Sequence, residues 1–588
     1  IPVFIMPIAV LDSIHILSEF FDRFPETQDR RRAILQVMRT LFAPMLFTSI
    51  TSVAGFASLM LTPIPPVEVF GGFVALGIAI AWVITVTFVP AYIMLLPDRT
   101  LVGFGVKQLE GEASSPLARA LLRFGPGTAR HAKLILTGTV LAGAVAAWGI
   151  TRITINDNPV RWFARSHPIR VADDVLNRHF GGTYMSYLAL RAPQTDESAE
   201  ALSHRLVDRI AAKRAESPSA APALDALSAQ VVAVGGAAAT AAEALANLED
   251  FVATRLDAAS WDDAEAWETA SELIAAERGA REVFKQPEVL RYIDGLQRDL
   301  LTTGVVGKSN SLTDIVKTVY RELLGGADAD FRVPDRADAV AQSLITYQSS
   351  HRPQDLWHFV TPDFRTTSLW VQMRSGDNRD MQRVVEAVEA YMRASPPPAG
   401  ITAEWFGLTY INVVWQKRMV TGMLESFSSS FLVVLAIMIV LFRSFFWGLL
   451  AMVPLTITIA LIYGLIGIVG KDYDMPVAVL SSLTLGLAVD FAIHFLARAR
   501  AIHVSRASWE DGLTQVFGEP ARAIARNVIV IALGFTPLLA ASLVPYKTVG
   551  FLMAAILLVS GFATLAILPA LLALFERFFF KGKRGVPS

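Results

Sequence analysis

Two acidic residues stand inside otherwise apolar stretches, and each is followed by a histidine on the same helical face. Asp490 and His494 lie four residues apart in GLAVDFAIHFLARAR, and Asp12 and His15 lie three apart in AVLDSIHIL. An acid in a bilayer costs about 2.5–3.5 kcal/mol on insertion scales, so a function is expected of it. Carboxyl and imidazole groups exchange protons. The pattern therefore predicts a proton relay through these four side chains.

Each of these residues also has a purely structural interpretation. A buried acid can be a neutral, hydrogen-bonded packing group, and a histidine near the end of an apolar run can be an interfacial residue. An ionised acid favours a charged imidazole, whereas burial favours a neutral one. The sequence does not decide between these two states of His15 and His494.

Polar side chains lie at a similar depth in neighbouring apolar segments. Asp490 precedes Arg498 by eight residues, which places it about 12 Å from the expected membrane boundary. The hydroxyl residues at comparable depth are Thr48, Ser49, Thr51 and Ser52. Asn527 repeats the position of Thr48 near the other end of the chain. We expect Thr48, Thr51 and Asn527 to support the acids by hydrogen bonding, although ordinary packing between membrane helices is the alternative.

The composition is that of a membrane protein. Of 588 residues, 53% are hydrophobic and 18% are charged, whereas soluble proteins are about 25% charged. Mean hydropathy is +0.45. The net charge of −1 argues against nucleic acid as a partner, and the absence of cysteine excludes disulfides and thiolate chemistry. Because the chain begins with Ile1 inside an apolar run, we expect an N-terminal part to be missing.

The apolar segments predict a polytopic α-helical membrane protein. A bilayer core of about 30 Å needs about 20 apolar helical residues. Nine segments meet this requirement: 1–20, 43–62, 67–96, 132–150, 422–442, 446–469, 475–497, 524–544 and 546–576. Arginine and lysine gather in the segments 20–42, 97–131, 498–523 and 577–584. The positive-inside rule places these loops in the cytoplasm and the long 151–421 segment outside.

The long 151–421 segment is predicted to be an α+β domain. TRITI (151–155), GGTYMSYLAL (181–190) and TTSLWVQMRS (366–375) are strand-like, and residues 381–394 have helical periodicity. An Ala-, Glu- and Asp-rich stretch at about 196–345 predicts a helical insertion.

An internal repeat relates the two ends of the chain. With an offset of 479 residues and no gap, His15 falls on His494 and Gly55 on Gly534. Gly71 falls on Gly550 in the same register. Repeats in the two halves of a membrane protein are typical of transporters, with sites near the midplane. The four glycines are expected to permit close approach of helices.

The motifs of the apolar segments resemble those of a known family of membrane proteins. AVLDSIHIL, LAVDFAIHFL, the GF pairs of the following helices and the FRS turn at 442–444 are similar to the RND superfamily of proton-driven exporters. The resemblance is closest to the MMPL-like and hopanoid-exporter branch, whose membrane repeat is similar to sterol-sensing domains. It implies a duplicated six-helix repeat, of which the first is incomplete here, with a porter-like extracytoplasmic domain.

The resemblance also implies an organisation of the chain. The expected parts are the last three helices of the first repeat (1–96), a cytoplasmic linker (97–131), the first helix of the second repeat (132–150), a periplasmic α+β domain (151–421), the remaining five helices (422–578) and a basic cytoplasmic tail (579–588).

The resemblance assigns proton coupling to Asp12 and Asp490, with one departure from the family. In the 479 register Asp12 aligns with Phe491, and Asp490 aligns with Leu11. The acids are thus one residue out of step, about 100° around a helix. The drug-efflux members of the superfamily also place a lysine on the helix that carries Asp490. This chain has none there, so the counter-charge of the acids is unassigned.

Other motifs carry less chemistry. NDNPVRW (156–162) is interpreted as a turn, with a site on the outer domain as the alternative. VGKSNS (306–311) lacks the earlier glycine of a P-loop and is rejected as a nucleotide site. The nine histidines are scattered and no catalytic constellation is visible, so we expect no metal site, no cofactor and no enzymatic activity.

The leading hypothesis is export of a lipid or other bulky hydrophobic molecule, driven by the proton-motive force, in the bacterial inner membrane. Membrane lipids, the hydrophobic substrate and protons are the expected partners. A periplasmic accessory protein and a homo-oligomer are expected as well. Two alternatives stay open: a sterol-sensing-like lipid sensor or assembly factor that does not pump, and a proton-driven motor for protein export.

Overall fold

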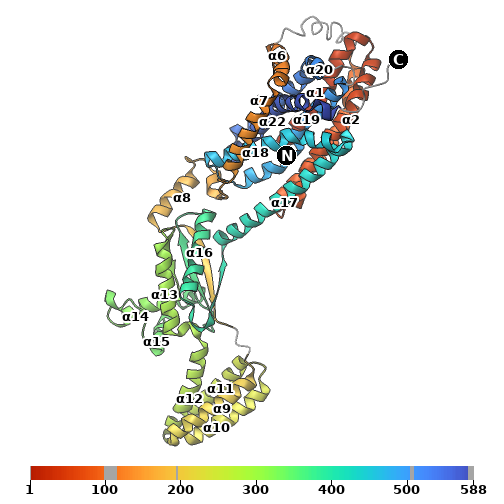
Figure 1. Cartoon of the computed structure of the whole chain (residues 1–588). Helices are drawn as coiled ribbons and strands as arrows, with labels where there is room; N and C mark the ends of the chain where they lie inside the picture. The colour runs from red at the N-terminus through yellow and green to blue at the C-terminus, as the bar shows by residue number, and fades with distance from the viewer. Residues whose placement is uncertain (1, 98–115, 194–196, 504–508, 581–588) are drawn as a thin grey trace. The chain divides into compact units, whose positions relative to one another are not determined.

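The chain forms two compact units in a computed structural model that describes residues 2–97, 116–193, 197–503 and 509–580 (Figure 1). The membrane unit comprises residues 1–171 and 414–588, and the α+β unit comprises residues 172–413. About half of the expected linker and most of the expected basic tail lie outside the described residues.

The membrane unit is mainly helical. Its main helices are α1 (Pro2–Thr27), α2 (Arg30–Ala57), α3 (Pro65–Leu95), α6 (Pro116–Arg130), α7 (Ala132–Ile150), α17 (Leu408–Phe442), α18 (Phe445–Val469), α19 (Met475–His503), α20 (Trp509–Val516), α21 (Glu519–Phe535), α22 (Val544–Leu574) and α23 (Glu576–Phe579). Short 3-10 turns follow α2 (η1, Ser58–Leu61) and α21 (η8, Thr536–Ala540). Helix α17 begins in the α+β unit and runs into the membrane unit.

Ten helices in the described residues are long and apolar enough to cross a bilayer, and nine of them overlap the expected spans. The tenth, Pro218–Ala237, lies in the α+β unit. There it contains helix α10 (Ala221–Ala237), which buries Leu224, Leu227 and Val231 among neighbouring helices. The chain is therefore a multi-pass membrane protein, as predicted.

The expected loop at 20–42 is largely helical. Helix α1 continues to Thr27, and α2 begins at Arg30, where the Asp29 carboxylate accepts hydrogen bonds from two backbone N–H groups. Phe20, Phe24 and Val37 are buried together in the helical extensions. This packing stabilises helix in a stretch whose charges suggested a loop.

Close helix contacts follow the internal repeat. A Cβ added at Gly55 would lie 2.8 Å from the Gly486 nitrogen, and one at Gly534 would lie 2.9 Å from Cγ of Pro7. Gly486 and Pro7 are themselves related by the 479 offset. Helix α2 therefore packs on α19 as α21 packs on α1, so the two repeats pack across a pseudo-two-fold axis.

The other pair of glycines repeats in the same way. A Cβ at Gly71 would lie 2.6 Å from Cβ of Leu59, and one at Gly550 would lie 2.6 Å from Cβ of Leu538. Leu59 and Leu538 are again 479 residues apart. All four glycines thus stand where helices approach closely.

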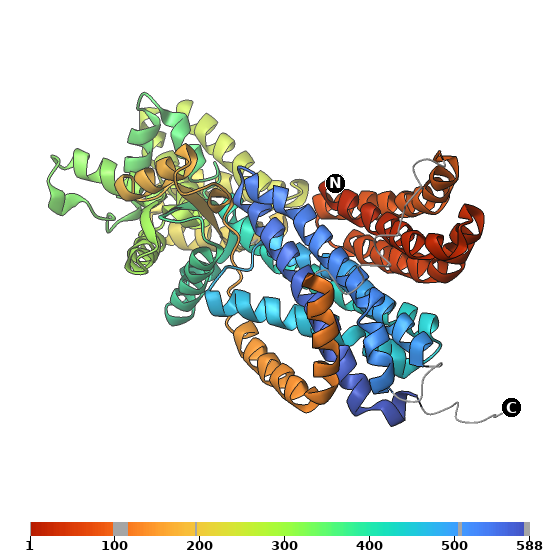
Figure 2. The same ribbon diagram turned by 90° about the horizontal axis from the view of Figure 1, so that it is seen from above.

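Helices α7 and α18 form a further close contact that sequence reasoning did not single out (Figure 2). A Cβ at Gly149 would lie 2.2 Å from the carbonyl oxygen of Gly464. Helix α7 is peripheral, because only 11% of its apolar stretch is buried, whereas 94% of the apolar stretch of α19 is buried. Helix α19 is therefore the central helix of the membrane unit.

The α+β unit contains a four-stranded antiparallel sheet in the order β2-β3-β1-β4. Its strands are β1 (Tyr184–Arg191), β2 (Val306–Asn310), β3 (Thr366–Met373) and β4 (Thr402–Phe406). Every second residue of β3 is buried, as its alternating sequence predicts. The helices that pack with the sheet are α13 (Pro287–Thr302), α14 (Leu312–Leu323), α15 (Ala337–Gln348) and α16 (Asn378–Ala394).

The helical insertion is shorter than expected. Helices α9 (Ala199–Glu216), α10, α11 (Ala241–Asp257) and α12 (Trp261–Arg281) share one apolar core. From Phe284 onward the chain instead packs with the sheet, because the apolar faces of α13 and α14 share a core with β1 and β3. The insertion therefore ends near residue 282 rather than 345.

TRITI does not form a strand. Its described backbone makes only an isolated bridge, between Ile155 and Tyr473. Beside this bridge the Asp472 carboxylate accepts hydrogen bonds from Thr154 at 2.9 Å and Asn156 at 3.0 Å, and it pairs with Arg161 at 3.1 Å. The start of the NDNPVRW segment is thus attached to the loop that precedes α19.

The rest of NDNPVRW forms the expected turn. Asn158 caps the short 3-10 helix η2 (Pro159–Trp162), and Trp162 Nε1 donates to buried Asp157 at 3.1 Å. Burial raises the pKa of Asp157 above its ordinary value, and the nearby Asp474 adds to the rise, while the Trp162 hydrogen bond opposes it. The folded protein therefore keeps a proton on Asp157 at a pH where the unfolded chain has released it.

The raised pKa predicts the effect of Asp157→Asn. Because the folded state binds the extra proton, the free energy of unfolding falls as the pH rises from about 3.9 through the raised pKa. The amide keeps an oxygen for Trp162 but has no such proton. The difference in melting temperature between Asp157→Asn and wild type, in detergent, should therefore grow in favour of Asn between about pH 4.5 and about pH 8. A difference in melting temperature that is the same at about pH 4.5 and about pH 8 would contradict the raised pKa of Asp157.

Candidate functional site

The two predicted acids are buried in the membrane unit. Asp12 lies in α1 and Asp490 in α19, with exposed fractions of 7% and 2%. They lie near enough for their charges to interact. Two ionised carboxylates held together in an apolar interior repel one another strongly.

Each acid has a hydroxyl partner, and both partners come from α2. Ser49 Oγ donates to Asp12 Oδ2 at 3.2 Å. The Thr51 side chain interacts with Asp490, but its hydroxyl proton is donated to the Thr48 carbonyl at 2.8 Å, so Thr51 can only accept a hydrogen bond from a protonated Asp490. The other carboxyl oxygen of Asp490, Oδ1, has no partner among the described residues. Sequence reasoning did not predict a supporting role for Ser49, because the direction of its side chain depends on the rotation of α2 about its axis. Its neighbour Thr48 instead donates to the Met45 carbonyl at 2.9 Å.

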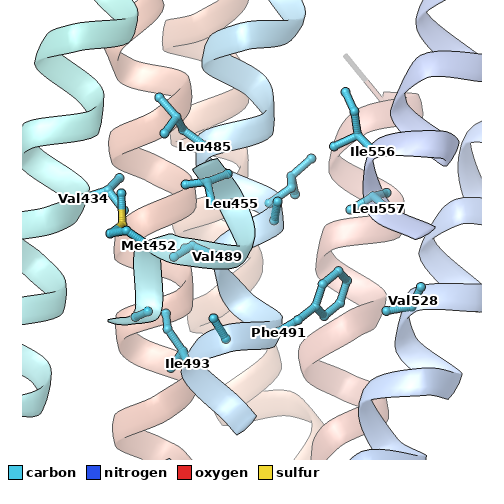
Figure 3. Packing of buried hydrophobic residues seen from close by; sticks show 14 of the residues in the cluster. Val434, Met452, Leu455, Leu485, Val489, Phe491, Ile493, Val528, Ile556 and Leu557 are labelled. Carbon is cyan, nitrogen blue, oxygen red and sulfur yellow. The ribbon is translucent and has the colours of Figure 1, made fainter. Parts of the chain in front are cut away.

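The repeat explains why the polar site is one-sided. The counterparts of Asp12 and Ser49 at the 479 offset are Phe491 and Val528. Figure 3 shows Phe491 reaching from α19 toward Val528 of α21, within the apolar core. The counterparts of Asp490 and Thr51 are Leu11 and Val530. Both acids therefore have their hydroxyl partners on α2, while the equivalent positions of α21 are apolar. This one-sided arrangement matches the offset of the two acids in the repeat.

The two predicted histidines meet near the pseudo-two-fold axis. The rings of His15 and His494 stack with centroids 4.2 Å apart and planes inclined by 23°. Asn527 Nδ2 lies 2.8 Å from His15 Nε2. With this amide orientation Asn527 donates to the ring, and with the reverse orientation it accepts from it. Asn527 therefore supports a histidine, not an acid.

Charged side chains surround the histidine stack. Arg498 and Arg526 lie near enough to His15 to interact electrostatically. Glu19 pairs with Arg498 at 2.7 Å and with Arg23 at 2.6 Å. Sequence reasoning missed Glu19, although one signal was present: Glu19 and Arg498 are related by the same offset of 479 as the two histidines.

No lysine or arginine forms an ion pair with Asp12 or Asp490 in the part of the chain that the structure describes. Where the drug-efflux members have a lysine, the side chains that contact the two acids here are neutral hydroxyl groups. No cluster of metal-ligating side chains occurs among the described residues either. The arrangement is suited to binding and releasing protons.

Comparison with known proteins places this geometry in a family. The model of the MMPL family matches residues 293–588, and the model of the Patched sterol-sensing domain (Patched SSD) matches residues 1–95. The Methanocaldococcus jannaschii membrane protein MJ1562 is 23% identical over 295 residues, which cover 50% of this chain and 73% of that protein.

A solved structure shows the same fold. The hedgehog release protein Disp from the water bear Hypsibius dujardini superposes with a TM-score of 0.51 at 13% identity. The match covers 97% of this chain but 62% of the Disp chain, so this chain spans less than two thirds of Disp. The predicted RND-type fold is confirmed, and since the family model matches half of its residues, this chain belongs to the MMPL family.

Proposed function

We propose that this protein is a proton-driven transporter that moves a lipid or other bulky hydrophobic molecule out of the bacterial inner membrane, with its α+β unit in the periplasm. The observation that supports this most is the pair of buried acids in α1 and α19. A buried acid without a cationic partner is costly unless it is protonated or hydrogen bonded. Such a pair is suited to taking up protons from one side and releasing them to the other.

Proton binding would bias the bundle between two states. A proton can shift such an equilibrium only if the two states bind it with different affinity. Asp12 and Asp490 meet this requirement when a change in packing between α1, α2 and α19 alters their hydroxyl contacts or their separation. The α19 end at Met475 is attached through Asp472 to the segment that leads toward the α+β unit, which provides a route for transmitting that change.

The energy of proton entry limits how the substrate travels. One proton that crosses a potential of about 150 mV releases about 3.5 kcal/mol. Exposing a chain of about 16 carbons to water costs about 13 kcal/mol, at about 0.8 kcal/mol per CH₂. Even two protons fall short of this cost. The substrate chain must therefore remain covered by protein or lipid along its path.

Reconstituted vesicles test the proposal. A fluorescent phospholipid placed in the inner leaflet should be extracted by an acceptor faster when a pH gradient of the correct sign is imposed. A protonophore should remove the acceleration. Extraction at one rate with and without the gradient would overturn the proposal.

A second candidate, a lipid sensor that does not pump, is favoured by the match of residues 1–95 to the Patched sterol-sensing domain. It predicts lipid binding that is indifferent to the proton gradient. Native mass spectrometry of copurified lipids, combined with the vesicle experiment, separates the two: a sensor holds lipid but never accelerates extraction. In either case we propose that the protein is not an enzyme, and that it acts with membrane lipids as a homo-oligomer.

A further inference from the structure

Four side chains on α1 and α19 form two symmetric pairs near the pseudo-two-fold axis. His15 stacks on His494, and one helical turn further along the same helices Glu19 pairs with Arg498. Both pairs join positions 479 residues apart. The first pair unites identical residues, whereas the second unites opposite charges. The second pair is therefore an ionic contact built across the axis directly beside two ionisable rings.

A small cavity joins the two pairs. It has a volume of about 30 Å³, and His15, His494, Glu19 and Arg498 all line it. A cavity of this size holds one water molecule when polar partners are present. The side chain of Glu19 is 8% exposed and that of Arg498 is 31% exposed. Arg498 is thus the more solvent-accessible member of the pair.

The histidine stack has room for one proton at a time. Two imidazolium rings with centroids 4.2 Å apart in a buried site would repel one another strongly. The charged groups that face the stack are Glu19 from α1, Arg498 from α19 and Arg526 from α21, with the neutral Asn527 beside them. A proton on the stack is repelled by both arginines, and Glu19 is the carboxylate that lines the shared cavity.

Glu19 can exchange partners without being left unpaired. It also pairs with Arg23, one turn along α1, and Arg23 in turn reaches Thr40 of α2 at 3.3 Å. If Arg498 moves away, Glu19 therefore keeps one cation and can turn toward a protonated imidazole. An uncompensated buried charge, which is the costly outcome, is avoided in both states.

We propose that the Glu19–Arg498 pair is the cytoplasmic gate of the proton route, opened when a proton on the His15–His494 stack displaces Arg498 from Glu19. This inference rests on the proposed function and adds a gate to it. The closed pair prevents proton exchange between the cavity and the cytoplasm. Displacement of Arg498 allows that exchange, and it frees the Glu19 carboxylate to accept the proton that leaves the histidine stack.

The gate predicts opposite effects from its two members. Arg498→Gln removes the arginine that closes the gate, so proton leak into vesicles without substrate should rise by about tenfold, the scale of one lost charged hydrogen bond. Glu19→Gln also breaks the pair, but it removes the carboxylate that stabilises a proton on the histidine stack and accepts it on the way out, so proton flux should fall below wild type. Proton flux is followed with a pH indicator trapped in the vesicles.

Two further variants complete the test. Arg498→Lys keeps the charge and should return the leak close to wild type. Arg23→Gln removes the cation that Glu19 keeps when Arg498 leaves, so it should lower the proton flux without causing a leak. A merely structural ion pair would give changes of the same sign in Arg498→Gln and Glu19→Gln, and that result would overturn the gate. If Glu19→Gln does not fold, a leak in Arg498→Lys as large as in Arg498→Gln would overturn it as well.

Asp490→Asn, measured in parallel, distinguishes failure of the gate from failure of the proposed transport function. Loss of gradient-driven extraction in Asp490→Asn, together with unaltered proton flux in both gate variants, would reject the gate and leave the proposed function standing. Wild-type extraction in Asp490→Asn would reject the proposed function, and the gate with it.

Discussion

Replacing Asp490 by Asn is expected to abolish gradient-driven extraction of lipid and to leave the protein folded. Asparagine has nearly the volume of aspartic acid, and its amide can still donate to the Thr51 hydroxyl oxygen. It has no proton to release, so the acid pair loses one of its two exchangeable sites. The expected rate is that of protein-free vesicles, measured by extraction of a fluorescent phospholipid under an imposed pH gradient.

A matched control is an acid that is exposed. Asp174, in α8 (Pro168–His179), is solvent-exposed, and Asp174→Asn should transport as wild type does. The melting temperature of Asp490→Asn should equal or exceed that of wild type, because an amide never carries the charge that a deprotonated acid would place in the apolar interior. Full gradient-driven extraction in Asp490→Asn would exclude this acid from the coupling.

Gly55→Ala should destabilise the membrane unit and disturb the acid site together. The new methyl group would lie 2.8 Å from the nitrogen and 2.9 Å from Cα of Gly486, and backbone atoms cannot turn aside as a flexible side chain can. Helices α2 and α19 must therefore separate. Overpacking of this kind costs about 1–3 kcal/mol. The separation would also strain the hydrogen bond that Ser52 Oγ donates to the Gly486 carbonyl at 2.8 Å.

The functional effect follows from position. Thr51 and Ser49 lie on the same helix as Gly55, one to two turns away, and they serve Asp490 and Asp12. A shift of α2 therefore moves both hydroxyl partners, and transport should fall along with the melting temperature. Gly143→Ala in α7 is the control, because nothing lies within 4 Å of the new methyl group. Equal melting temperatures for the two variants would contradict the close α2–α19 contact.

The sequence was sufficient for the nine spans and for the repeat. Apolar length identifies a membrane helix without reference to its neighbours, because the bilayer imposes the length. The match of Gly55 with Gly534 and of Gly71 with Gly550 also predicted which helix surfaces lie in close contact. These features follow from local composition or from internal comparison.

Side-chain partners were beyond the sequence for a physical reason. Thr48, Ser49 and Thr51 lie within one turn of α2, and only its rotation against α1 and α19 decides which hydroxyl reaches an acid. Glu19 and Arg498 have the charges expected at a membrane boundary, so nothing in the sequence indicates that they pair. Their contact depends on where α1 and α19 cross. The end of the helical insertion was missed because α13 has the same helical period as α12 but packs with the sheet.

The central claim is that lipid movement and proton movement are coupled through Asp12 and Asp490. Its most direct test records both in the same vesicles, with a trapped pH indicator and a fluorescent phospholipid. We predict that each lipid extracted is accompanied by one or two protons, and that Asp12→Asn and Asp490→Asn each abolish both signals together. Lipid extraction that proceeds without accompanying proton movement would contradict it.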